Sequence, residues 1–328
     1  MHDVQAPARP AERSFASNRV VRHSGAKYPI IQAPMSWIAR AQLASAVSAA
    51  GGLGLLENSS KDLAIIQREV AAIRAATDQP FGFNLPVKFL KTSEEDEKAI
   101  LAWVIGQAPR FVTTSAGDPR RYIRQLKDAG IIVYHATPSL EGSLKAEDAG
   151  CDGLVVEGAE SAGIRAPDGP HSFVLLQQVK ERVGVPIVAA GGIVDGRGMA
   201  AAFALGAEGV AMGTRFVAST ESPVHVGYKA AIVAAPPAAT LTVGRPPNIV
   251  SRVLRTELSE KVYAGDAHAS PVRNIVQALY IGGDAVGAMG SAGESAGLIH
   301  EVKSCAEIVQ ETVAGFWREI DRLAALRG

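Results

Sequence analysis

Two glycine turns carry the residue types best suited to chemistry in this chain. They are Ala190-Gly191-Gly192 and Met212-Gly213-Thr214. Glycine lets the backbone approach a ligand closely and adopt positive φ, and free N–H groups at a loop or helix start then face an anion. Each turn follows a short apolar segment typical of a buried strand. One such turn would indicate only a bend, but the pair predicts a phosphate-binding cradle.

Alternating strands and helices must position these turns. Eight apolar segments predict buried strands at 28–33, 53–56, 81–85, 111–114, 131–136, 153–156, 186–190 and 209–213. Helical spacing follows seven of them, at 41–50, 61–76, 94–106, 119–130, 139–149, 172–183 and 196–205. Continuous apolar strands are buried on both faces, which indicates a parallel sheet covered by helices. The predicted fold class is therefore α/β, a (β/α)₈ TIM barrel in preference to an open doubly wound sheet.

The barrel explains the position of the turns. Chemistry on this fold lies at the carboxyl ends of the strands, and the loops after strands seven and eight often bind a phosphate. Both turns fall in these loops. We expect residues 18–220 to form the barrel core, and residues 221–328 to form a lid and a helical extension, with helices at 270–282 and 306–327. Residues 1–17, polar and carrying two prolines, are expected to be a flexible N-terminal arm.

Composition restricts the class of function. The 328 residues include 33 basic and 33 acidic side chains, so the net charge gives no footprint for nucleic acid or for a membrane surface. Two cysteines, Cys151 and Cys305, argue against a disulfide framework or a cysteine metal site and fit a reducing cytoplasm. No run of 18 apolar residues predicts a transmembrane helix. The expected partner is a small-molecule substrate, with no metal; Phe316 and Trp317 leave a homodimer open.

Six short motifs, in order over about residues 20 to 315, resemble the nitronate monooxygenase family, formerly called 2-nitropropane dioxygenases. That family also includes the FMN-type bacterial enoyl-ACP reductases and some NAD(P)H:quinone reductases. The motifs are YPIIQAPM at 28–35, AAGGLG at 49–54, GFNL at 82–85, AAGGI at 189–193, MGTRF at 212–216 and GESAGLI at 293–299.

The resemblance implies FMN as the cofactor. In the family, the backbone after the first strand lies along the isoalloxazine ring, and an asparagine in the third strand reaches the ring or the ribityl chain. The two glycine turns would hold the phosphate. The implied cofactor-binding residues are Ala33, Pro34, Met35, Asn84, Ala190, Gly191, Gly192, Met212, Gly213 and Thr214.

The loop after the sixth strand departs from the family at its chemical group. It runs EGAESAGIR from Glu157 to Arg165, where the family pattern is close to EGxExGGH. That histidine acts beside the flavin as a base or as a donor to an oxyanion, but Ile164 has no proton to exchange. Glu160 matches a family position and is expected to order the loop. Arg165 could bind an anionic substrate; these three residues would line the substrate pocket.

Two histidines are candidate replacements for the missing group. His135 ends the fifth strand, and His171 stands at the far end of the loop that carries Ile164. Either could supply a proton. The alternatives are that His135 contacts the flavin or supports such a contact, and that His171 bonds locally at a helix start.

The predicted function is an FMN-dependent oxidoreductase. It would use NADH or NADPH to reduce a quinone or an activated double bond, or it would oxidise a nitronate-type anion at flavin N5. Hydride transfer depends mainly on stacking and orientation, and an ionised nitronate needs no base. Two alternatives stay open: a non-redox enzyme of the isomerase or aldolase type that binds a phosphate ligand, and a flavin-binding pseudoenzyme. The first would want a lysine or paired carboxylates at strand ends.

Overall fold

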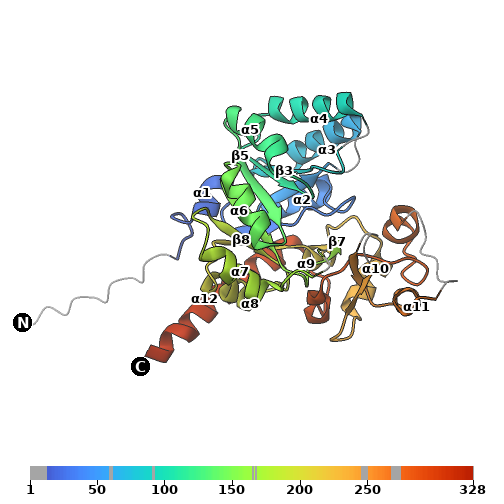
Figure 1. Ribbon diagram of the computed structural model, residues 1–328. Helices are drawn as coiled ribbons and strands as arrows, with labels where there is room; N and C mark the ends of the chain where they lie inside the picture. Colours follow the sequence, from blue (N-terminus) through green and yellow to red (C-terminus); the bar gives the residue numbers. More distant parts are fainter. Residues whose placement is uncertain are drawn as a thin grey trace, which may run out of the picture.

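A ring of eight parallel strands forms the centre of the computed structural model, which describes residues 13–58, 62–90, 93–164, 166, 168–244, 250–266 and 275–327 (Figure 1). Neighbours in the sheet follow the order β1-β9-β8-β6-β5-β4-β3-β2, and a bridge between Ile31 and Leu53 joins its two edges. This closure confirms the (β/α)₈ barrel. The strands are β1 (Ile30–Gln32), β2 (Gly54–Glu57), β3 (Phe81–Pro86), β4 (Phe111–Ser115), β5 (Ile132–Thr137), β6 (Gly153–Glu157), β8 (Ile187–Ala190) and β9 (Gly209–Met212).

Helices cover the outside of this ring. Several begin where a side chain accepts hydrogen bonds from the free amides of the first turn, as Asp62, Ser93 and Ser139 do. The last helix, at 305–324, packs against the helices at 196–204 and 41–49 and so completes the helical layer. The helices are α2 (Ala41–Ala49), α3 (Leu63–Ala76), α4 (Glu94–Gly106), α5 (Arg120–Asp128), α6 (Leu140–Asp148), α7 (Ser172–Lys180), α8 (Gly196–Ala204) and α12 (Cys305–Ala324).

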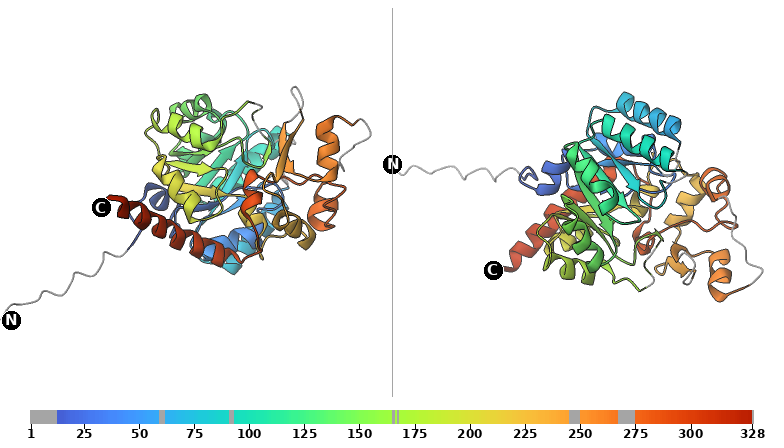
Figure 2. Two further views of the ribbon diagram at one scale, coloured as in Figure 1. Left: turned by 90° about the horizontal axis from the view of Figure 1, so that it is seen from below. Right: turned by 45° about the horizontal axis from the view of Figure 1, so that its top comes forward.

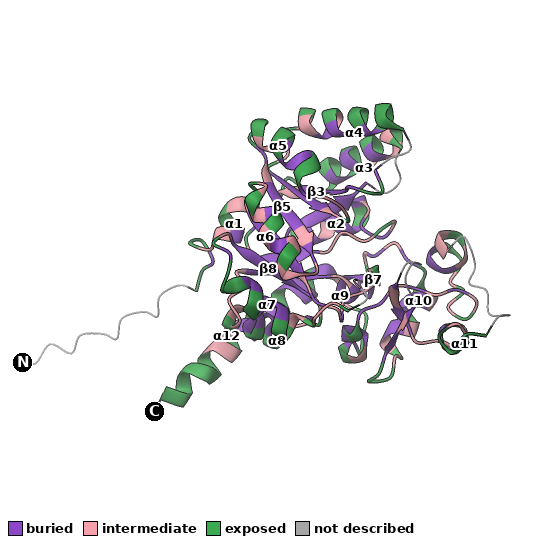
Figure 3. Cartoon of the chain, in the orientation of Figure 1, coloured by how far each residue is buried: buried purple, intermediate pink, exposed green. Residues whose placement is uncertain are grey.

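The apolar core consists of two clusters, one inside the barrel and one around it. Side chains such as Phe111, Tyr134 and Val155 pack together in its interior, and a larger cluster lies between strands and helices. Helix α1 (Arg19–Ser24) closes the amino-terminal end of the barrel, where His23 Nδ1 lies 3.0 Å from the hydroxyl of Tyr134. Figure 3 shows the strands as buried and the outward faces of the helices as exposed. The carboxyl ends of the strands are therefore the open end at which a ligand can meet the sheet.

The lid, within residues 226–281, lies to one side of the barrel (Figure 2). It holds α10 (Val226–Val233), α11 (Glu257–Ala264) and a π-helix at Val276–Ile281, which is the described part of the helix expected at 270–282. Its sheet has the order β10-β11-β7, from β10 (Thr240–Val243), β11 (Ser251–Leu254) and β7 (Gly163–Ile164). Strand β7 belongs to the loop after β6. This strand is absent from the sequence prediction because a strand of two residues has no periodic signal.

The N-terminal segment is better anchored than expected. Residues 1–12 lie outside the described residues, but Phe15 is buried against Phe316 and Trp317 of α12. Arg13 Nη2 also lies 2.8 Å from Asp321 Oδ1. Arg13 and Phe15, within the segment expected to be a flexible arm, thus contact α12, where a large aromatic side chain covers an apolar helix face. Within the described ranges, no helix is long and apolar enough to cross a membrane.

Candidate functional site

The first glycine turn has a backbone that only glycine adopts easily. Gly191 has φ 109° and Gly192 has φ 72°, directly after β8. A β-carbon on Gly191 would lie 2.8 Å from Ser161 Oγ and 2.9 Å from Glu160 Oε1. Both the positive φ and the close approach therefore require glycine at position 191. The turn is pressed against the loop after β6.

The second turn begins the short helix α9 (Thr214–Val217), with Gly213 as its N-cap. A β-carbon on Gly213 would lie 3.6 Å from both the Ala33 side chain and Met35 Sδ, so this turn faces the loop after β1. Thr214 is buried, and its Oγ1 accepts a hydrogen bond from Gly293 N at 3.0 Å. The structure thus brings the motifs at 33–35, 212–216 and 293–299 together at one end of the barrel.

A buried hydroxyl next to the first turn fits a phosphate. Ser161 Oγ is buried and has no hydrogen-bond partner among the described residues. Buried polar groups are nearly always hydrogen-bonded, so this atom calls for a ligand or a water. Together with the amides of the two turns, it forms a donor set suited to an anion. The residues present therefore fit the FMN phosphate, and Ser161 is a member that the sequence analysis missed.

Two asparagines mark the other part of the site. Asn84 is buried at the end of β3, and its Oδ1 accepts hydrogen bonds from Thr113 Oγ1 at 2.9 Å and Ser115 Oγ at 3.2 Å. This leaves the amide NH₂ of Asn84 to donate to a ligand. Asn58 Nδ2 donates to the main-chain oxygen of Asn84, while Asn58 Oδ1 is buried without a partner among the described residues. One free donor and one free acceptor suit a ring that carries both carbonyl and N–H groups, as isoalloxazine does.

A buried carboxylate holds the loop after β1. Glu57 Oε1 accepts a hydrogen bond from Trp37 N at 2.9 Å and lies 3.5 Å from Arg40 Nη1. Trp37 itself has φ 68°, a strained conformation for a large side chain. Ala33, Pro34 and Met35 immediately precede it. Glu57 therefore fixes the backbone that is expected to lie along the flavin ring, a role with no signal in the sequence beyond a polar residue at a strand end.

The loop after β6 is ordered by Glu160. The carboxylate of Glu160 accepts hydrogen bonds from Ser172 N at 3.1 and 3.2 Å, and its main-chain oxygen accepts from Glu294 N at 2.9 Å. Ile164 lies in β7, where it pairs with Ser251, and its side chain is 54% exposed. Arg165 lies outside the described residues. An apolar side chain that is open to solvent thus stands at position 164, where the resemblance implies the family's proton-transfer group.

The two candidate histidines differ in placement. Tyr134 and Ala136 face the barrel interior, so His135, between them on β5, points outward with Val133. It is buried, its Nδ1 lies 2.8 Å from Thr114 Oγ1, and burial lowers its pKa to about 4. This orientation contradicts a role for His135 as a proton donor at the mouth.

His171 remains with the loop after β6. It is exposed at the start of α7, and its Nε2 lies 3.7 Å from Glu294 Oε1. No other described contact assigns it a role, so proton transfer by His171 stays a prediction.

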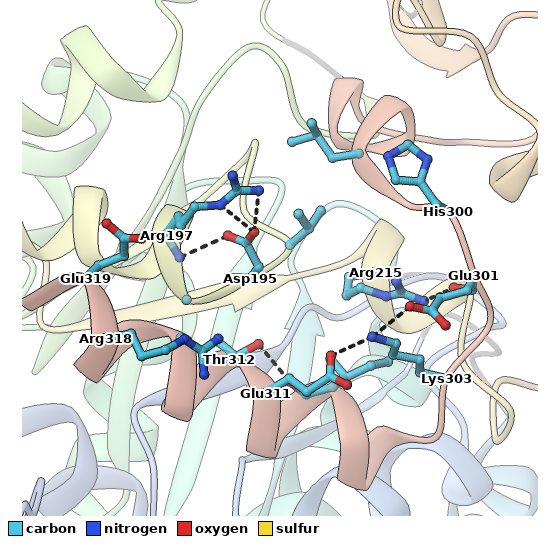
Figure 4. Close-up of a pocket in the computed structure, with 15 residues that line it drawn as sticks. Asp195, Arg197, Arg215, His300, Glu301, Lys303, Glu311, Thr312, Arg318 and Glu319 are labelled. Carbon is cyan, nitrogen blue, oxygen red and sulfur yellow. Dashed lines mark hydrogen bonds and ion pairs between the residues drawn. The ribbon is translucent and has the colours of Figure 1, made fainter. Parts of the chain in front are cut away.

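A polar cavity of about 340 Å³ lies behind the cradle, between α8, α9 and α12 (Figure 4). Arg215 is buried in its wall, and its Nη2 donates to the main-chain oxygens of Ala218 and Glu301, each at 2.7 Å. Lys303 pairs with Glu301 at 2.8 Å and with Glu311 at 2.6 Å. Lys303 is thus balanced by two carboxylates, whereas Arg215 Nε is buried without a hydrogen-bond partner among the described residues. Through its main-chain bonds, Arg215 joins the second turn to the segment at Glu301.

Known proteins share the sequence and the fold of this chain. The family model described as nitronate monooxygenase matches residues 17–315. A Mycobacterium tuberculosis protein, "(3aS,4S,5R,7aS)-5-hydroxy-7a-methyl-1-oxo-octahydro-1H-indene-4-carboxyl-CoA dehydrogenase", is 34% identical over 76% of this chain and 70% of its own. A nitronate monooxygenase of Paraburkholderia phytofirmans is 32% identical over 64% of this chain and 68% of its own. The structure of FabK from Thermotoga maritima superposes with a TM-score of 0.86 at 35% identity, covering 94% of this chain and 99% of FabK.

Proposed function

We propose, from the premise that this chain belongs to the nitronate monooxygenase family, that it is an FMN enzyme which uses NADH or NADPH to reduce an activated carbon–carbon double bond. Membership makes it an FMN-dependent oxidoreductase. The alternative of a non-redox isomerase or aldolase therefore falls. The direction and the substrate are the parts that we propose.

Bound FMN would supply a centre that accepts and donates hydride at N5, and the protein would supply the grip. Gly191, Gly192 and Ser161 would hold the phosphate from one side, with Gly213 and Thr214 on the other. The loop after β1 would support the ring, while Asn84 donates to it and Asn58 accepts from it. Orientation of the two reactants is the main contribution that such a site makes to hydride transfer.

The observation that carries the proposal is Ile164. This side chain occupies the family's histidine position, is exposed, and has no proton to take or give. Abstraction of a proton from a neutral nitroalkane needs a base, whereas hydride transfer from nicotinamide to flavin does not. Isoleucine at position 164 therefore argues against oxidation of neutral nitroalkanes, whereas hydride transfer from nicotinamide to flavin does not depend on a base there.

The substrate class follows from the relatives. The M. tuberculosis protein is named for a CoA thioester, and the family includes enoyl-ACP reductases, whose substrates are also acyl thioesters. The carbonyl group of a thioester activates the adjacent carbon–carbon double bond toward hydride addition. We therefore rank an α,β-unsaturated acyl thioester first and a quinone second. Addition of the hydride to carbon must be followed by a proton, for which His171 is the predicted donor.

Absorbance measured anaerobically tests the proposal. The purified protein should show the bands of oxidised flavin, and NADH or NADPH should bleach them. Crotonyl-CoA should then restore the bands without oxygen. If a quinone restores them and crotonyl-CoA does not, the substrate class is a quinone and not an acyl thioester. Absence of flavin bands, or no bleaching with either nucleotide, would refute the reductase. Failure of every acceptor after bound FMN is confirmed would leave the pseudoenzyme.

A second candidate is oxidation of nitronate anions. It is favoured by the same Ile164, because a nitronate that is already ionised needs no base, and by the nitronate monooxygenase among the relatives. Oxygen consumption with preformed propyl nitronate, compared with neutral nitropropane, tests it. Activity on the anion alone would support this candidate. Equal rates on both forms would show that isoleucine at position 164 does not prevent proton abstraction.

A further inference from the structure

Arg252, on lid strand β11, joins three segments that are far apart in the sequence. Its side chain is only 12% exposed. Nε donates to the main-chain oxygen of Ala159, in the loop after β6, at 3.1 Å. Nη1 donates to Thr240 Oγ1 in β10 at 3.1 Å and lies 2.9 Å from Glu294 Oε1. One guanidinium therefore contacts the lid, the loop that carries Ile164, and the segment 294–298.

The main chain of β11 grips the same loop. Arg252 pairs with Gly163, and Ser251 pairs with Ile164, in an antiparallel register. Strand β7 has two residues and lies at the edge of this sheet, with β11 as its neighbour. So short a strand does not hold its own position. The placement of Ile164 therefore depends on where the lid is docked.

Glu294 extends the connection to the phosphate cradle. Its main-chain N donates to the oxygen of Glu160 at 2.9 Å, and the neighbouring Gly293 N donates to Thr214 Oγ1 at 3.0 Å. Glu160 lies against the first glycine turn, and Thr214 belongs to the second. A contact between Arg252 and Glu294 thus reaches both turns through one hydrogen bond each.

We propose that Arg252 is a positioning residue that docks the lid on the phosphate cradle and, through β7, holds Ile164 at the mouth of the site. The inference rests on the proposed function in one respect, that the cradle binds FMN. Coupling between two sites is reciprocal. Bound FMN therefore stabilises the docked lid by the same factor by which docking of the lid strengthens FMN binding, so a variant in which the lid undocks should bind FMN more weakly.

Hydrogen exchange of the full-length protein, with and without added FMN, tests the coupling. Arg252→Met keeps the length of the side chain and removes the guanidinium. We expect amides in 159–164 and 250–254 to exchange at least tenfold faster, and the Kd for FMN to rise at least tenfold. The matched control is Arg255→Met. Arg255 bonds to Ala238 O at 2.9 Å and to Glu260 Oε1 at 2.8 Å, and both of these partners belong to the lid itself. It should leave exchange in 159–164 unchanged.

Two results would overturn the inference. One is wild-type exchange in residues 159–164 of the Arg252→Met protein, and the other is equal acceleration by both arginine variants. Should Arg252→Met fail to fold, Glu294→Ala removes the same ion pair from its more exposed side and should give the same pattern. A protein that binds no FMN would refute the proposed function, whereas the exchange comparison without FMN still tests whether Arg252 docks the lid.

Discussion

The cradle assignment can be tested by adding one methyl group at Gly191. Gly191→Ala places a β-carbon 2.8 Å from Ser161 Oγ and 2.9 Å from Glu160 Oε1, on a backbone with φ 109°. A suitable control is Gly130→Ala, because Gly130 also has positive φ, 76°, but a β-carbon there would meet nothing within 4 Å. The pair separates backbone strain, which both variants carry, from loss of the site, which only the first should cause.

The expected magnitudes follow from the geometry. A side chain in left-handed backbone costs roughly 1–2 kcal/mol, so both variants should lose about that much stability. Gly191→Ala must also displace Ser161 or Glu160. Losing one hydrogen bond from the Ser161 hydroxyl to a charged phosphate costs about 1.5–3 kcal/mol of binding free energy. Since about 1.4 kcal/mol is a factor of ten, the Kd for FMN should rise roughly ten- to hundredfold.

Fluorescence titration of FMN with the apoprotein gives the Kd, and urea denaturation gives the stability. We expect a loss of stability in both variants, larger in Gly191→Ala because its methyl group also meets Ser161 and Glu160, and a loss of FMN affinity in Gly191→Ala alone. Wild-type FMN affinity in Gly191→Ala would refute the cradle, because a methyl group inside that turn must weaken the binding of a ligand that the turn holds. An equal loss of affinity in Gly130→Ala would show that general destabilisation accounts for the effect.

Three further predictions address the chemistry and the barrel. Ile164→His should raise oxygen consumption with neutral nitroalkanes by on the order of a hundredfold, because imidazole can take the proton; no gain would show that the loop differs in more than this residue. His135, whose folded pKa of about 4 lies below the ordinary value, contributes stability that is complete above the unfolded pKa near 6.5 and is lost as pH falls toward 4. The free energy of unfolding measured with urea should therefore be about 2 kcal/mol lower at pH 5 than at pH 7 because of this group. His135→Asn should abolish this difference, and a difference that persists in the variant would refute a buried neutral histidine. Gly153→Ala places a methyl group in contact with the ring of Tyr134 inside the barrel and should cost about 1–3 kcal/mol by thermal unfolding, whereas Gly106→Ala, with open space around it, should not.

The barrel could be predicted from the sequence because each of its units has a local signature. Helix α4, for example, begins after Ser93 and ends at Gly106 in both the sequence pattern and the structure. Its cap, its apolar spacing and its glycine all lie in one continuous segment of the chain. The C-terminal helix was equally visible, from the spacing of apolar residues in α12. Elements whose stability comes from neighbours in the chain are the ones that sequence patterns detect.

The orientation of His135 could not be predicted, for a reason inherent in parallel barrels. Their strands are apolar on both faces, so the pattern shows that a strand exists but does not show which residues point inward. A shift of one residue exchanges the two faces. The structure fixes this phase through Tyr134, which fills the barrel interior and thereby turns His135 toward the helices. Ser161 and Asn58 were missed for a related reason, since only burial without a partner distinguishes them from ordinary polar loop residues.

The structure also explains how position 164, where the resemblance implies a histidine, can carry isoleucine without disturbing its loop. The loop after β6 is held by the Glu160 carboxylate on Ser172 N and by main-chain pairing of β7 with β11. Neither contact uses the side chain at position 164, which is more than half exposed. Exposed substitutions of this kind usually change stability by no more than about 0.5 kcal/mol. Chemistry at position 164 can therefore change with little cost to the fold, so a difference in reaction between this chain and relatives with histidine is expected to follow from that one side chain.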